Sequence, residues 1–325
     1  MRVNKSEASP EIARPVGRAT ARDWIFLLLL GAIWGGAFMW TKIATEGFAP
    51  LSLAGLRLSI GALALTGLLL AQGSRWPGLA TPAGRRFWLF ALAVGFLANA
   101  MPFTALAWAQ RHIDSALAGV FMATVPLFVL PLAHAFVPGE RMTLRKVAGF
   151  LLGFTGILVL IGPGALSALG AGGSLALAAQ GACLLTAFGY ASGSIASKRA
   201  PEFGPLPFAA ASLVFAALMT LPLAIAFEDP FGGAPGLLPT AAVIYLGLVP
   251  TGVAMVMLLQ VIQSAGPSFL ALVNYQVPIW AVIFGAAVLG EAPSPRLGLA
   301  LVLILAGLAI AQNLLGLRRG GHARG

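Results

Sequence analysis

Charged residues are scarce in this chain of 325 residues. They make up 9% of it, where a soluble domain carries roughly 25%, and 59% of the residues are hydrophobic. So little charge cannot cover a surface that faces water, which excludes a soluble protein and predicts an integral membrane protein. The single cysteine, Cys183, excludes an intrachain disulfide and a cysteine-based metal cluster. We expect no metal site and no cofactor.

Acidic residues are missing from the interiors of the long apolar runs. The ten that exist lie in the tail, in loops or at helix ends: Glu7, Glu11, Asp23, Glu46, Asp114, Glu140, Glu202, Glu228, Asp229 and Glu291. No carboxylate pair is therefore placed inside the membrane for aspartyl-protease chemistry. The segment GYASGS (189–194) resembles a serine-nucleophile motif only loosely, because its spacing differs and no histidine is placed to act as a base. We predict no catalytic residue and no enzyme, and expect this segment to form a small-residue packing face.

Basic residues give the chain a net charge of +10, and their positions predict its orientation. They lie in short loops between apolar runs without interleaved aromatic residues, which argues against a nucleic-acid partner. If the N-terminus is cytoplasmic, sixteen of them fall on the cytoplasmic side, against Lys42, Arg111 and Arg296 on the other. The positive-inside rule then places both termini in the cytoplasm, with the lipid bilayer of a bacterial inner membrane around the chain.

Apolar runs long enough to cross a bilayer recur along the whole sequence. A spanning helix needs about 20 residues, and the runs are 24–44, 51–71, 87–110, 115–137, 144–162, 174–197, 206–227, 238–263, 267–290 and 295–316. No ten-residue alternation indicates a β-barrel. The predicted fold is therefore all-α, with ten transmembrane helices. Residues 1–22 and 317–325 are predicted to be basic cytoplasmic tails, the first of them disordered.

An internal repeat divides the runs into two sets of five. TVPLFVLPLAHAFVPGERMTLR (124–145) and QVPIWAVIFGAAVLGEAPSPR (276–296) share a proline at the third position and a later Gly-Glu, and APLSLAGL (49–56) echoes GPLPFAAA (204–211). The copies lie about 151–155 residues apart, which predicts repeats over 23–165 and 174–316. Because five is odd, the two repeats must enter the membrane from opposite sides. Inverted repeats of this kind are typical of transporters, with the substrate site near the midplane where the repeats meet.

These segments resemble the EamA-type families of the drug/metabolite transporter superfamily. The residues that carry the resemblance are WGGAFMWTKIA (34–44), APLSLAGLR (49–57), FTALAWAQRHIDSALAGVFMATVPLF (103–128), VPTGVAMVMLLQVIQSAG (249–266) and both Pro…Gly-Glu helix ends. The resemblance covers residues 23–316. It implies a ten-helix inner-membrane carrier with a central cavity that exports amino acids or other metabolites. One branch, the YddG-like exporters, handles aromatic amino acids among other substrates.

Neutral polar and aromatic side chains within the runs are the candidate substrate contacts. They are Asn274, Tyr275, Asn99, Trp34, Tyr190, Gln276 and Thr104. Three prolines, Pro102, Pro126 and Pro278, are expected to kink their helices and to act in gating. Each proline lacks the N–H that would bond four residues back. Unpaired backbone at membrane depth is tolerated where it is buried in protein or lines a hydrated cavity. The kinks and the nearby polar groups therefore predict one central path.

Within VNYQVP (273–278), helical geometry separates the three polar residues. Successive residues point about 100° apart, so Asn274 shares a stripe with small residues such as Ala281 and is the best substrate contact. Tyr275 lies beside that stripe, and Gln276 is expected to bond a neighbouring helix. For each of two other residues, the sequence leaves two interpretations open. Trp34 forms either a cavity wall or core packing, and Arg57 is either functional or extends its long stem to the outer interface.

The predicted function is export of small metabolites, above all amino acids and including aromatic ones, by alternating access through a cavity between the repeats. Without an intramembrane proton-coupling carboxylate, we expect facilitated or weakly coupled transport and no stoichiometric proton antiport. The substrate is the partner, and a monomer is favoured. The alternative function is a carrier of hydrophobic drugs or lipid-linked molecules. A different class of protein, a membrane enzyme or a structural or receptor subunit, is the further alternative.

Overall fold

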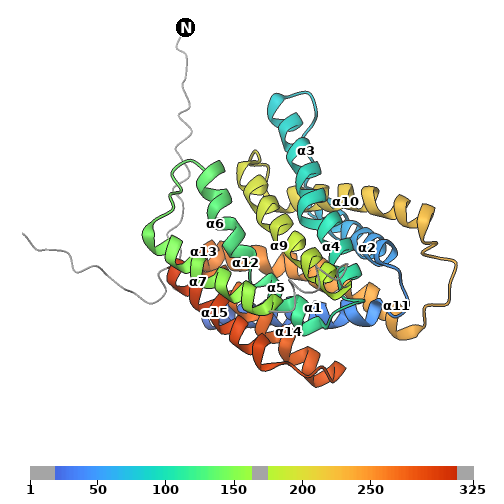
Figure 1. Cartoon of the computed structure of the whole chain (residues 1–325). Coiled ribbons are helices and arrows are strands. Elements are labelled where there is room, and N and C mark those ends of the chain that lie inside the picture. The colour runs from blue at the N-terminus through green and yellow to red at the C-terminus, as the bar shows by residue number, and fades with distance from the viewer. Residues whose placement is uncertain (1–18, 163–174, 313–325) are drawn as a thin grey trace, which may run out of the picture.

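Helices make up the regular structure in residues 19–162 and 175–312, which are the residues that the computed structural model describes, and this part contains no strand (Figure 1). The predicted tail at 317–325 lies outside these ranges, as does most of the tail at 1–22. In chain order the helices of the first half are α1 (Ala21–Ala44), α2 (Pro50–Ala71), α3 (Pro82–Gly95), η1 (Phe96–Ala100), α4 (Met101–Ala109), α5 (Ser115–Met122), α6 (Val125–Phe136) and α7 (Leu144–Ile161). Those of the second half are α9 (Leu175–Arg199), α10 (Pro205–Phe227), α11 (Leu237–Leu246), η2 (Gly247–Val253), α12 (Ala254–Ala265), α13 (Pro267–Leu270), α14 (Val273–Leu289) and α15 (Pro295–Ala311).

Eight helical segments of the described part are long and apolar enough to cross a membrane. They coincide with the first eight predicted runs to within a few residues. The last two runs correspond to α13 with α14 and to α15. The apolar helices α14 and α15 have 17 residues each and are shorter than a typical span. The fold is thus an all-helical membrane fold, while the number ten and the orientation of the termini stay predictions.

Local sequence signals explain where the helices begin and end. Thr20 and Asp23 form a reciprocal capping box at the start of α1. Proline occupies the first turn of α2, α3, α10 and α15, where its missing N–H costs nothing. The last residue of α14 is followed by Gly290 in the left-handed conformation (φ 68°), which glycine adopts without a steric penalty.

Two of the long segments are interrupted by π-helical turns. The first, η1, lies between α3 and α4 and ends just before Pro102, and the second, η2, lies between α11 and α12 and contains Pro250. At the end of η1 the N–H of Met101 bonds to the carbonyl of Phe96, five residues back. A proline removes one α-helical donor, and a wider turn accommodates that loss.

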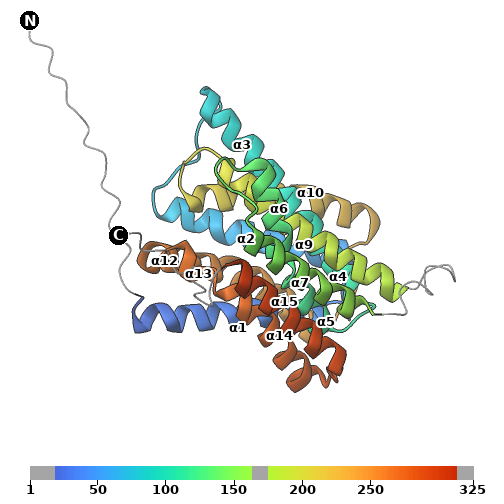
Figure 2. The same ribbon diagram turned by 60° about the vertical axis from the view of Figure 1, so that its left-hand side comes forward.

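Helices from corresponding places in the two halves of the chain lie side by side. α2 packs on α10, and α7 packs on α15, as both views of the molecule show (Figures 1 and 2). Glycines permit the close approach of α7 and α15, because a Cβ on Gly149 or Gly307 would collide with the facing backbone. The same holds where Gly35 of α1 meets Trp280 and the backbone of Val277 in α14. Small residues therefore let α1 pack closely on α14 and α7 on α15.

Candidate functional site

A cavity of about 350 Å³ lies among the helices of both halves. It adjoins a larger space of about 910 Å³, which we call the vestibule, and Trp34, Asn99 and Phe103 line both spaces. The vestibule is bordered by Ser197 of α9, by residues 200–205 where the chain passes from α9 to α10, and by Ile262 of α12. We call this end of the molecule the vestibule end. The opposite end carries the 45–49 and 110–114 loops, and none of those residues lines the cavity or the vestibule.

The cavity is lined by residues at equivalent positions of the two halves. Three pairs of lining residues stand 152 positions apart and a fourth pair stands 156 positions apart. They are Ala98 with Pro250, Met122 with Asn274, Val125 with Val277, and Trp34 with Tyr190. The cavity therefore lies where the corresponding parts of both halves meet.

Trp34 forms a wall of the cavity and is fixed in place by a hydrogen bond. Its indole N–H donates to the backbone carbonyl of Pro250 in η2 at 3.0 Å. Trp34 belongs to α1, and its nearest small neighbours Gly31 and Gly35 allow α14 to approach the same helix closely. Of the two interpretations that the sequence left open for Trp34, the cavity wall is the one the structure supports.

Asn99 and Asn274 bring amide groups to the cavity from opposite halves. Asn99, in η1, donates through Nδ2 to the carbonyl of Val94 at 3.2 Å. Asn274, in the first turn of α14, donates to the carbonyl of Ala271 at 3.1 Å. Each amide uses one of its two N–H donors on a nearby backbone carbonyl, and its Oδ1 remains an acceptor for another molecule.

Arg57 of α2 places a guanidinium group in the cavity wall. It is 7% exposed and lies over the ring of Phe103, with its central carbon 3.9 Å from the ring centroid. Its Nε donates to the hydroxyl of Thr251 in η2 at 3.4 Å. Phe103 in turn makes an edge contact with Tyr190. Arg57 is the one charged side chain among the described residues that line the cavity, and it does not extend to the membrane surface.

Three of the predicted contacts lie outside the cavity lining. The hydroxyl of Tyr275 interacts with Oε1 of Gln312 at 3.3 Å, so it is turned toward α15. Gln276 packs against Gly31 of α1, as expected of a residue that faces a neighbouring helix, but its buried Oε1 has no hydrogen-bond partner in the described residues. Thr104 lines a separate groove between α2, α4 and α10, and its hydroxyl donates to the carbonyl of Ala100.

The three predicted kink prolines lie beside interruptions of their helices. Pro102 follows η1, and Pro126 follows a break at 123–124 that separates α5 from α6. Pro278 lies inside α14 and lines the cavity, with a break at 271–272 before it. The π-helical turns at Pro102 and Pro250 were not predicted. The sequence signal that could have predicted them is a proline with a nearby polar residue: Asn99 lies three residues before Pro102, and Thr251 directly follows Pro250.

Three polar ties hold the end of the molecule opposite the vestibule. The carboxylate of Glu291 accepts hydrogen bonds from the backbone N–H groups of Ser115 (2.6 Å) and Ala116 (2.8 Å) at the start of α5. Glu228 accepts one from the N–H of Ser52 in α2 at 2.7 Å. The ammonium of Lys42 in α1 donates to two carbonyls of the 110–113 turn. We call this end the tied end.

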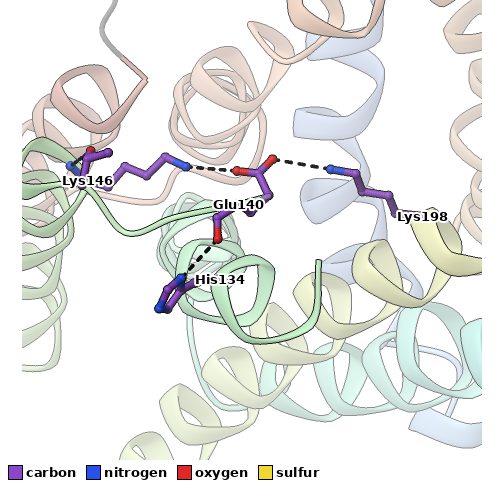
Figure 3. A network of polar contacts seen from close by, with 5 residues as sticks. His134, Glu140, Lys146 and Lys198 are labelled. Atoms are coloured by element: carbon purple, nitrogen blue, oxygen red, sulfur yellow. Dashed lines mark hydrogen bonds and ion pairs between the residues drawn. The ribbon is translucent and has the colours of Figure 1, made fainter. Parts of the chain in front are cut away.

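A corresponding glutamate, Glu140, lies 151 positions before Glu291 and forms ion pairs instead (Figure 3). Its carboxylate is 3.1 Å from Nζ of Lys146 in α7 and 3.5 Å from Nζ of Lys198 in α9. Its backbone carbonyl lies 3.2 Å from Nδ1 of His134. The hydrogen bond from Lys146, followed by the charges of both lysines, lowers the pKa of Glu140 from its ordinary value of 4.5. The group therefore links the 138–143 loop to α9.

The two halves of the chain each match one family model, that of the EamA-like transporter family, over residues 23–162 and 177–312. The chain belongs to this family. Its relatives include an uncharacterized inner membrane transporter, YedA, of Escherichia coli K12, which is 27% identical over 86% of this chain and 87% of its own length. A probable terminal-alkyne amino-acid exporter of Streptantibioticus cattleyicolor is 28% identical over 90% of this chain and 94% of its own. A solved crystal structure matches 92% of this chain and all of its own, with a TM-score of 0.64 and 25% sequence identity.

The protein is therefore a membrane transporter, and its homologues in Escherichia coli are named inner membrane transporters. The family resemblance found in the sequence is confirmed. Membership in a transporter family also fits the expectation that the protein is not an enzyme.

Proposed function

We propose that this EamA-like transporter exports small metabolites, above all amino acids and including aromatic ones, through the cavity between its halves. The observation that carries the proposal is the set of equivalent positions that line one cavity from both halves. A site made in this way is accessible from either side when the halves rock against each other, as alternating access requires. A volume of about 350 Å³ lies at the lower end of the range for small-molecule sites and suits a molecule of amino-acid size.

The chemistry of the walls supports the same substrate class. Aromatic and aliphatic side chains, among them Trp34, Phe103 and Met122, supply most of the lining and would hold side chains of varied shape. Amide oxygens of Asn99 and Asn274 would accept hydrogen bonds from an amino group. Adaptable apolar walls discriminate weakly between shapes, so we expect broad specificity. The relative named as a probable amino-acid exporter also favours amino acids.

The proposed topology is ten transmembrane helices in two inverted five-helix repeats, with both termini in the cytoplasm of a bacterium. The packing of α2 on α10 and of α7 on α15 supports it, because helices at corresponding places meet at an axis that relates the repeats. Under this topology the vestibule end faces the cytoplasm and the tied end faces outward. The structure then represents an inward-facing state of the transporter.

Flux into and out of proteoliposomes that contain the purified full chain tests the proposal. We expect preloaded radiolabelled amino acids to exchange with external amino acids, and empty liposomes to show no exchange. A hydrophobic dye and a fluorescent lipid form the second arm, since a drug or lipid carrier would move these and no amino acid. A pH-sensitive dye inside the liposomes measures coupling. Proton movement in fixed ratio to substrate would overturn the expectation of weak coupling.

A further inference from the structure

A guanidinium group without a carboxylate partner lies in the cavity wall. The ion pairs among the described residues both belong to Glu140 of the 138–143 loop, and none of the paired residues lines the cavity. Arg57 has a cation–π contact with Phe103 and one hydrogen bond to Thr251, both with neutral groups. A buried charge that lacks a counter-charge is costly, and charged residues at membrane depth mark substrate pathways by default.

The donors of Arg57 are only partly used by the protein. A guanidinium has five N–H donors in a planar fork. One of them, on Nε, bonds to Thr251, while the two terminal nitrogens have no hydrogen bond to any described residue and are not among the buried unpaired atoms. Because Arg57 lines the cavity, these nitrogens are accessible from it. Their geometry matches the two oxygens of a carboxylate, which a guanidinium binds through two parallel hydrogen bonds.

This charge also breaks the near-symmetry of the cavity. Aligning 49–56 with 204–211 pairs Arg57 with Ser212, a neutral residue that lines the vestibule. The positive charge therefore comes from the first half alone. Around it stand the acceptors Asn99 and Asn274, which have no negative charge and leave their Oδ1 atoms unused.

We propose that Arg57 binds the carboxylate of the substrate and makes this carrier selective for carboxylate-bearing molecules. The amide oxygens of Asn99 and Asn274 accept from the ammonium of an amino acid, while the fork of Arg57 donates to its carboxylate. Phe103 positions the guanidinium, whose central carbon lies 3.9 Å from the ring centroid. The inference rests on the proposed function and narrows its substrate class. Amines and amides that lack the carboxylate bind and cross poorly.

The first experiment measures binding without transport. The purified full chain in detergent is heated with L-phenylalanine, 3-phenylpropionate, phenylalanine amide or phenethylamine, and the melting temperature is recorded. We expect stabilisation by the two carboxylates and little by the amide and the amine. Bidentate charged hydrogen bonds predict affinities about 10- to 100-fold higher for the carboxylates. Equal stabilisation by all four compounds, or by none, would overturn the assignment of Arg57.

Substitutions test whether Arg57 causes the preference for carboxylates. Arg57→Gln is expected to lose the preference for carboxylates, and Arg57→Lys to keep part of it, because lysine retains the charge but not the fork. Arg111→Gln is the matched control, since Arg111 lines the separate groove between α2, α4 and α10 and not the cavity. A carboxylate preference retained in Arg57→Gln, or lost in Arg111→Gln, would contradict the proposal. If Arg57→Gln does not fold, Arg57→Lys is compared with wild type. A weaker carboxylate preference in Arg57→Lys supports the proposal, and an equal preference contradicts it.

The flux assay separates this inference from the proposed function. If carboxylates stabilise wild type selectively but no amino acid crosses the membrane, the proposed function fails and the carboxylate site stands. If amino acids cross as fast as their amides and amines, the function stands and the site of Arg57 fails. Export of phenylalanine with about tenfold slower movement of its amide supports both.

Discussion

The side chains of Asn99 and Thr251 make the same hydrogen bond in the two halves of the chain. Asn99 donates to the carbonyl of Val94, and Thr251 donates to the carbonyl of Leu246, each five residues back. Donors and acceptors are 152 positions apart in both cases, and each donor lies in a π-helical turn. The hydroxyl of Thr251 bonds to the carbonyl that Pro250 cannot reach for lack of an N–H. Both side chains therefore line the vestibule while bonded to the backbone of the preceding helix.

Replacing Thr251 with valine is expected to destabilise the protein. The change keeps the shape but removes the donor to Leu246 and the acceptor for Nε of the buried Arg57. Leaving a buried donor unpaired costs about 1–3 kcal/mol, so thermal unfolding in detergent should begin at a lower temperature. Thr251→Ser keeps the hydroxyl and serves as control. A valine variant as stable as wild type would show that neither bond matters.

Removing the carboxylate of Glu291 is expected to open the tied end. Two backbone N–H groups at the start of α5 lose their acceptor in Glu291→Ala. If those bonds are absent in the outward-facing state, their loss shifts the equilibrium toward that state. One hydrogen bond to a charged group contributes about 1.5–3 kcal/mol, so the loss of even one of the two shifts the equilibrium at least about tenfold.

A cysteine reporter in the cavity measures that shift. Cys183 is the one cysteine of the chain, so Cys183→Ala gives a background in which Thr41→Cys is the reporter. We expect an impermeant maleimide added outside to react faster after Glu291→Ala. Glu140→Ala, at the corresponding glutamate, is the control and should not speed this reaction. Equal rates in wild type and Glu291→Ala would exclude a gating role for the tie.

Acidification is expected to loosen the link between the 138–143 loop and α9. The pKa of Glu140 is lowered, chiefly by the hydrogen bond from Lys146, so its ionised form stabilises the fold. That contribution is complete above the ordinary value of 4.5 and is lost as the pH falls through the lowered pKa. The pairs are partly exposed, which limits the effect to about 1 kcal/mol or less.

Limited proteolysis of the 138–143 loop follows that loss, because cleavage reports local opening. Cleavage of wild type by an acid-tolerant protease should accelerate as the pH falls below the ordinary value of 4.5, after correction with a soluble substrate. Glu140→Gln lacks the ion pairs and should cleave faster at neutral pH, with little further change on acidification. If cleavage of this variant accelerated on acidification as much as that of wild type, a group other than Glu140 would be responsible for the pH response.

The sequence predicted the positions of the helices well and the neighbours of their side chains only in part. Apolar runs bounded by proline, glycine and charge predict where helices begin and end, and the first eight were found within a few residues. Thr104 was grouped with Asn99, but five residues at about 100° each turn it to another face. The surroundings of Arg57 could not be predicted, because Phe103 and Thr251 come from distant helices.

A comparison of Asn274→Ala with Tyr275→Phe tests the assignment of the cavity against the sequence expectation that both residues bind substrate. Asn274 lines the cavity, whereas the hydroxyl of Tyr275 is directed to Gln312, the residue that follows α15. We expect Asn274→Ala to raise the KM for amino-acid export about tenfold, the effect of losing one hydrogen bond to a charged group. Tyr275→Phe should leave KM unchanged and lower only the melting temperature slightly. A raised KM in Tyr275→Phe, with Asn274→Ala like wild type, would move the substrate site from the cavity to the α14–α15 interface.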